Sequence, residues 1–268
     1  MNFPPLFARF SLLCTILLCT LPFLQPYHLY PLTTFYSEWL AFALGLGVMT
    51  VWMDGRLQER AGIPWVALSP FALAVLLMVH GLLGWSPYFG QALAGALYLA
   101  WAGLLIMAGR SLARLWGVET LSLVIASALA AGALLSAAAG LIQFYGLKTP
   151  LNAWIAQPRG AALFGNLAQA NHFASHATLG LLSLAYLSLR GRRAAWIALP
   201  CTLPLLFVLG LSGSRSVWLF LLTALLLAAG VRAVVRDETN KRLFIVVGVL
   251  VIIYFLMQLV VQAGWIRP

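Results

Sequence analysis

Long apolar runs, separated by short polar segments, make up almost the whole chain. Nine of these runs approach the ~20 residues that a helix needs to cross the hydrocarbon core of a bilayer. They cover residues 6–24, 35–53, 64–83, 88–108, 120–145, 172–189, 194–211, 216–231 and 243–263. The pattern therefore predicts an all-α polytopic membrane protein with about nine transmembrane helices, forming a single helical domain over residues 1–268.

The composition supports a membrane protein and argues against a nucleic-acid partner. Hydrophobic residues make up 63% of the chain and charged residues 8%, whereas a soluble domain has roughly 25% charged residues. The mean hydropathy is +0.96 and the net charge is +10. A nucleic-acid site needs its basic residues gathered on one face, but here they are scattered between the apolar runs. Membrane lipids are the expected surroundings.

The positions of lysine and arginine predict the orientation, because cytoplasmic loops carry the excess of these residues. Most of the 16 basic residues lie near the start of the first run or in every second connection. They are Arg9, Arg56, Arg60, Arg110, Arg114, Arg190, Arg192, Arg193, Arg232, Arg236, Lys241 and Arg242. This arrangement places the N-terminus in the cytoplasm and the C-terminus outside, in the periplasm if the membrane is a bacterial inner membrane.

Four basic residues lie on the predicted external side, against the orientation rule, and need another explanation. They are Lys148, Arg159, Arg215 and Arg267. Arg159 and Arg215 belong to two polar segments. The longest external loop, residues 146–171, contains the first part of "PRGAALFGNLAQANHFA", and "GLSGSRSVWL" forms a short hinge between the seventh and eighth runs.

The hinge has the residues of a phosphate site. A helix N-terminus attracts anions through its unpaired N–H groups and its partial positive charge. Ser214 adds a hydroxyl, Gly213 lets the backbone approach closely, and the guanidinium of Arg215 matches phosphate oxygens. The alternative is a serine N-cap with an arginine that reaches toward the lipid headgroups.

The longest external loop adds further hydrogen-bonding groups. Asn171 is expected to cap the sixth helix, with His172 in its first turn. Gln169, Asn171 and His172 suit sugar hydroxyls or phosphate oxygens, and Arg159 could share a diphosphate with Arg215. His172 and His176 lie four positions apart, a spacing that metal ligands on one helix face also have. No acidic residue or cysteine lies nearby in sequence, so no metal is expected.

The segment "RGAALFGNLAQANHFASH", followed by "LGLSGSRSVWL", resembles the superfamily of bacterial O-antigen ligases, O-antigen polymerases and pilin-type protein O-oligosaccharyltransferases. The "GN.AQANHFA" form is most similar to the ligases that glycosylate pilins. The resemblance covers roughly residues 155–225, and elsewhere only the general pattern of many helices is similar.

The resemblance implies a GT-C-like membrane glycosyltransferase that transfers a preassembled glycan from undecaprenyl diphosphate. The acceptor would be a hydroxyl of a pilin-like protein or of the lipid A core, on the periplasmic face of the inner membrane. No cofactor is implied. The family's motif residues carry over onto Arg159, Gln169, Asn171, His172 and Arg215, and Ser214 lies in the same turn.

Family members usually continue into a large periplasmic loop with an essential histidine, so we expect this chain to be the N-terminal part of a longer enzyme. The catalytic residue stays open, with His172 as the candidate in this chain. Two alternatives remain. One is O-antigen ligation or polymerisation. The other is a transporter or lipid-handling scaffold, which the scarcity of charge inside the runs and the external polar cluster disfavour.

Overall fold

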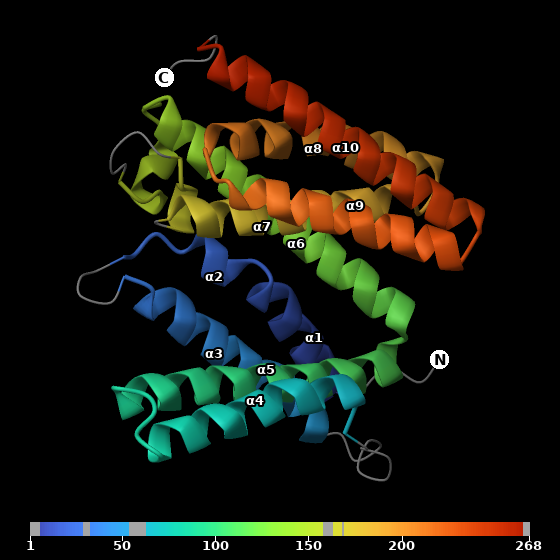
Figure 1. The fold of residues 1–268 in the computed structure, drawn as a ribbon. Helices are drawn as coiled ribbons and strands as arrows, with labels where there is room; N and C mark the ends of the chain where they lie inside the picture. Colours follow the sequence, from blue (N-terminus) through green and yellow to red (C-terminus); the bar gives the residue numbers. More distant parts are fainter. Residues whose placement is uncertain (1–5, 29–32, 54–62, 158–162, 168, 265–268) are drawn as a thin grey trace. The chain divides into compact units, whose positions relative to one another are not determined.

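The computed structural model describes residues 6–28, 33–53, 63–157, 163–167 and 169–264, and every regular element in these ranges is helical (Figure 1). In chain order the elements are α1 (Leu6–Leu18), α2 (Leu21–Leu24), α3 (Phe35–Met49), the 3₁₀ helix η1 (Thr50–Met53), α4 (Trp65–Leu82), α5 (Phe89–Trp116), α6 (Val118–Phe144), η3 (Pro150–Trp154), η4 (Gly165–Leu167), α7 (Ala170–Ser188), α8 (Arg192–Leu211), α9 (Ser216–Val234) and α10 (Glu238–Gln262).

Eight helical segments of the described chain are long and apolar enough to cross a membrane. They correspond to eight of the nine predicted runs, and α1 and α2 together form the first of them. The remaining run, the sixth along the chain at residues 172–189, forms α7, which has 19 residues but falls short in apolarity. Its first two turns contain Asn171, His172, Ser175 and His176. The all-α polytopic fold is thereby confirmed, and the orientation of the termini stays a prediction.

The chain divides into two compact units. The first contains Met1–Ile16 and Phe42–Ser122. Within it, the hydroxyls of Ser11 and Thr50 lie 2.9 Å apart and join α1 to η1. A Cβ placed on Gly103 would lie 2.7–2.9 Å from the Phe71 ring, so α5 and α4 pack at a distance that only glycine permits.

The second unit contains Leu17–Ala41 and Leu123–Pro268, and its core is built around α7. Eleven of the 19 residues of α7 are buried, and α8, α9 and α10 contact this helix (Figure 1). Phe173 and Leu181 of α7 are fully buried beside Leu205 of α8. A Cβ on Gly180 would overlap that of Ala133 in α6, so small residues set the close approach of α6 and α7.

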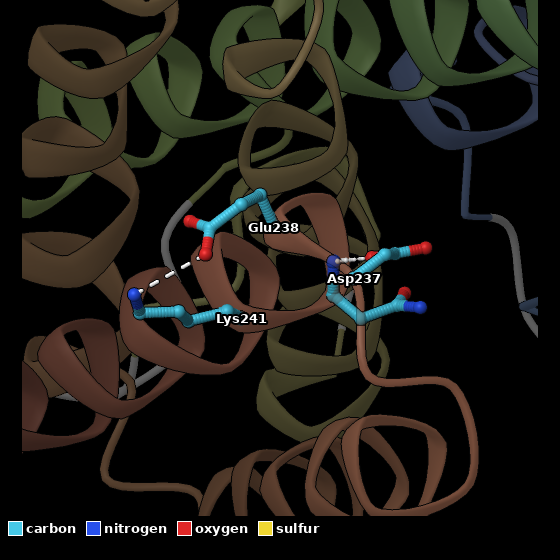
Figure 2. Close-up of polar contacts among 4 residues, drawn as sticks. Asp237, Glu238 and Lys241 are labelled. Atoms are coloured by element: carbon cyan, nitrogen blue, oxygen red, sulfur yellow. Dashed lines mark hydrogen bonds and ion pairs between the residues drawn. The ribbon is translucent and has the colours of Figure 1, made fainter.

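Some helices are longer than the predicted apolar runs, because charged residues at their ends are also helical. α10 begins at Glu238, whereas its apolar run begins near residue 243. Asp237 caps this helix, because its Oδ1 accepts a hydrogen bond from the Asn240 N–H at 2.6 Å. Lys241 Nζ lies 3.4 Å from Glu238 Oε1 in the same first turn (Figure 2).

Candidate functional site

The two polar segments of the sequence meet in the second unit. Ser214 Oγ, in the hinge before α9, donates a hydrogen bond to Asn171 Oδ1, in the first turn of α7, at 2.8 Å. The two residues are 43 positions apart in sequence. Their bond places the N-terminus of α7 beside that of α9. Because each helix carries a partial positive charge at this end, the pair attracts negative charge more strongly than either helix alone.

The hinge is held by its own hydroxyl groups. Ser212 and Ser214 are both buried, and Ser212 Oγ accepts from the Ser214 N–H at 3.3 Å and donates to Leu209 O at 2.8 Å. Gly213, with φ of 63°, makes the left-handed turn between them. The alternative of a serine N-cap is wrong, since Arg215 occupies the N-cap position without a capping side-chain bond. The hinge thus leaves Arg215 exposed at the start of α9.

The start of α7 also differs from the prediction. Gln169 is the N-cap residue, with extended backbone angles (φ −145°, ψ 129°), and its carbonyl accepts from the Phe173 N–H at 3.0 Å. Asn171 therefore lies inside the first turn, and its amide is directed to Ser214 rather than to its own helix. Gln169 and His172 are exposed. Arg159 lies outside the residues that the structure describes.

His176 is unlike His172, although both belong to α7. Its ring is buried and stacks on Phe23 of α2, with ring centroids 4.1 Å apart and planes 8° from parallel. The two histidines therefore have different surroundings. Over the described ranges, no group of three His, Cys, Asp or Glu side chains could hold a metal ion.

Asn166 holds the loop between α6 and α7 through the hydrogen bonds of its side chain. Its Oδ1 accepts from the Ala156 N–H at 2.9 Å, and its Nδ2 donates to Leu24 O at 2.7 Å and to Trp154 O at 2.8 Å. His28 adds a fourth contact, because its Nε2 lies 2.6 Å from Asn166 O. One asparagine thus joins η3, η4 and the segment after α2.

Gln143, in the last turn of α6, fixes the other side of the same loop. Its Oε1 accepts from the Gly165 N–H at 3.1 Å, and its Nε2 donates to Ala156 O at 2.7 Å. Gly165 has φ of 53°, and a Cβ there would lie 3.1 Å from the Phe173 ring. A bulkier residue would disturb both the turn and α7.

Gln143 and His28 are not among the site residues that the sequence predicts. Gln143 is a lone amide that follows the apolar residues 137–142 in α6, and that isolation is the feature that could have identified it. His28 lies two residues after Pro26 in a short loop, and nothing in the sequence connects it with residue 166.

We expect the bond between Asn171 and Ser214 to contribute about 1 kcal/mol to stability, as a typical intramolecular hydrogen bond does. A double-mutant cycle of Asn171→Ala and Ser214→Ala, measured by unfolding of the purified protein in detergent, should give a coupling energy of this size. The control cycle pairs Asn171→Ala with Ser188→Ala at the far end of α7, where the effects should add. Additive effects in the first cycle would contradict the contact.

The comparisons with known proteins point to one class of protein, the glycosylation ligases. The family described as "Protein glycosylation ligase" matches residues 163–187, which include η4 and nearly all of α7. This match confirms the resemblance predicted from the sequence.

A particular relative extends the similarity to most of the chain. The general O-oligosaccharyltransferase of Acinetobacter baylyi is 29% identical over 214 residues, which cover 78% of this chain and 36% of the relative. The chain thus matches little more than a third of the relative's length. No solved structure matches the chain.

Proposed function

We propose that this chain forms the donor-binding part of an O-oligosaccharyltransferase. The enzyme would transfer a preassembled glycan from undecaprenyl diphosphate to a hydroxyl of a periplasmic protein, at the outer face of a bacterial inner membrane. The observation that carries this proposal is the hydrogen bond between Asn171 and Ser214. It brings two helix N-termini and the exposed Arg215 to one place.

The diphosphate would bind where these positive groups gather. The Arg215 guanidinium can donate two parallel hydrogen bonds to phosphate oxygens, and the first N–H groups of a helix have no partner within it. The same groups would stabilise the negative charge that develops as the diphosphate leaves the glycan. Arg159 is a second proposed cation for this diphosphate.

The exposed side chains of Gln169 and His172 are proposed to face the glycan and the acceptor. In the reaction, the bond between the sugar C1 and the phosphate oxygen breaks while the acceptor oxygen bonds to C1. The acceptor hydroxyl gives its proton to a base, and undecaprenyl diphosphate leaves. His172 is the candidate base in this chain, because it is exposed one residue after the Asn171–Ser214 bond.

The comparisons favour a protein acceptor over lipid A core or a growing polymer, since both the matching family and the matching relative are described by transfer to proteins or by a general O-linked activity. Deleting the gene in its host tests this choice. Mass spectrometry should then show loss of glycan from periplasmic or pilin-like proteins, while lipopolysaccharide banding stays unchanged. Altered banding with intact glycoproteins would instead identify an O-antigen ligase or polymerase.

A further inference from the structure

An apolar groove of about 650 Å³ lies between α8 and α10 in the second unit. This volume is within the range of roughly 300–1,000 Å³ that is usual for small-molecule sites. Eleven of its twelve lining residues are uncharged, and the only hydroxyl among them, on Thr202, already donates to Leu199 O at 2.6 Å. The remaining lining residue is Arg192, at the first position of α8. The groove therefore has a hydrocarbon surface with a cation at one end.

The groove has the length of one bilayer leaflet. It extends along α8 from Arg192 to Leu203, which at the rise of an α-helix is about 16 Å. Half of the hydrocarbon core is about 15 Å. Trp196, one turn into α8, lines the groove and is 70% exposed, as suits an aromatic side chain near the lipid headgroups.

Positive charge gathers at the Arg192 end. α8 and α10 run parallel, because Gln258 Nε2 donates to Gly210 O at 3.5 Å near their far ends, so both helices begin at this end. The sequence here, residues 190–193 and 232–242, contains seven basic and two acidic residues. Both acidic side chains are engaged within α10, Asp237 as the cap and Glu238 with Lys241 (Figure 2). Arg192 has no ion-pair partner in the part of the chain that is described.

We infer that this groove binds an anionic phospholipid, with one acyl chain between α8 and α10 and the phosphate beside Arg192. Basic pockets between transmembrane helices recognise such headgroups. The groove is separate from the proposed donor site, because Arg192 and the hinge at residues 212–215 lie at opposite ends of α8. A lipid there would support the pairing of α8 with α10.

Native mass spectrometry of the purified chain in detergent tests this site, with added phosphatidylglycerol or phosphatidylcholine of identical acyl chains. We expect phosphatidylglycerol to occupy the protein about fivefold more than phosphatidylcholine. Arg192→Gln should abolish this preference, and Val249→Trp, which fills the groove, should reduce binding of both lipids. The matched controls are Arg193→Gln and Ile252→Trp, at residues that do not line the groove.

Equal binding of the two lipids by the wild-type chain would overturn the inference, since it would indicate nonspecific contact with annular lipid. The inference would also be overturned if Arg192→Gln changed lipid binding no more than Arg193→Gln, and Val249→Trp no more than Ile252→Trp. A wild-type dimer that Val249→Trp converts to monomer would identify the groove as a surface between copies instead. Arg192→Gln changes only an exposed side chain at the end of the groove, so it keeps the test valid even if Val249→Trp folds poorly.

Discussion

Replacing Arg215 by alanine should weaken binding of a polyprenyl diphosphate by about 10- to 100-fold. Charge-assisted hydrogen bonds contribute about 1.5–3 kcal/mol each, and every 1.4 kcal/mol corresponds to a factor of ten in Kd. Arg215 is exposed where the N-termini of α7 and α9 meet, which is the place proposed for the diphosphate. The measurement is the Kd of farnesyl diphosphate for the purified protein in detergent.

Arg215→Lys should give an intermediate Kd, because lysine keeps the charge but loses the planar pair of donors. Arg193→Ala is the control, since it removes an exposed arginine at the other end of α8. If Arg215→Ala binds as well as the wild-type protein, the diphosphate does not lie at the hinge, and the proposed donor site is wrong.

The second large effect should come from Asn166→Asp. Aspartate has the size of asparagine but cannot donate the hydrogen bonds that Leu24 O and Trp154 O now accept. At a side chain that is 4% exposed, it would also place a negative charge beside these two carbonyl oxygens. We expect a loss of about 3 kcal/mol or more in unfolding free energy, seen as a lower Tm in detergent.

Asn152→Asp provides the comparison. Asn152 also donates to a backbone carbonyl, that of Leu147 at 3.0 Å, but its side chain is exposed and water can replace the lost bond. Its effect should stay within about 1 kcal/mol. A Tm that falls equally in both variants would mean that Asn166 does not anchor the loop between α6 and α7.

The membrane helices could be predicted from the sequence because a bilayer imposes one requirement, a sufficient length of apolar residues. This requirement can be recognised in each segment by itself. The first two predicted runs have the bounds of the observed spans Leu6–Leu24 and Phe35–Met53. Hydropathy did not indicate the break between α1 and α2, because the residues around Thr20 are apolar enough to continue a span. It also missed the last two turns of α5, because a helix continues through polar residues such as Arg114 where the apolar run has ended.

The candidate site could be predicted only in part. The composition of the two polar segments selected Asn171 and Ser214, but sequence spacing cannot show that residues 43 positions apart share a hydrogen bond. The N-cap at Gln169 was missed because asparagine is the better capping residue by itself, and here its contact with the hinge outweighs that preference. Gln143 was missed because its partners are backbone groups of a distant loop.

The enclosed position of α7 has a consequence for how the protein is assembled in the membrane. Polar side chains at helix positions inside the bilayer oppose insertion, and α7 is the long helix of the second unit that falls short in apolarity. Only residues 189–191 join it to the strongly apolar α8. We expect the two to leave the translocon as a helical hairpin, so that α8 supplies the driving force that α7 lacks. Biogenesis of the helix that carries Asn171 and His172 then depends on its partner.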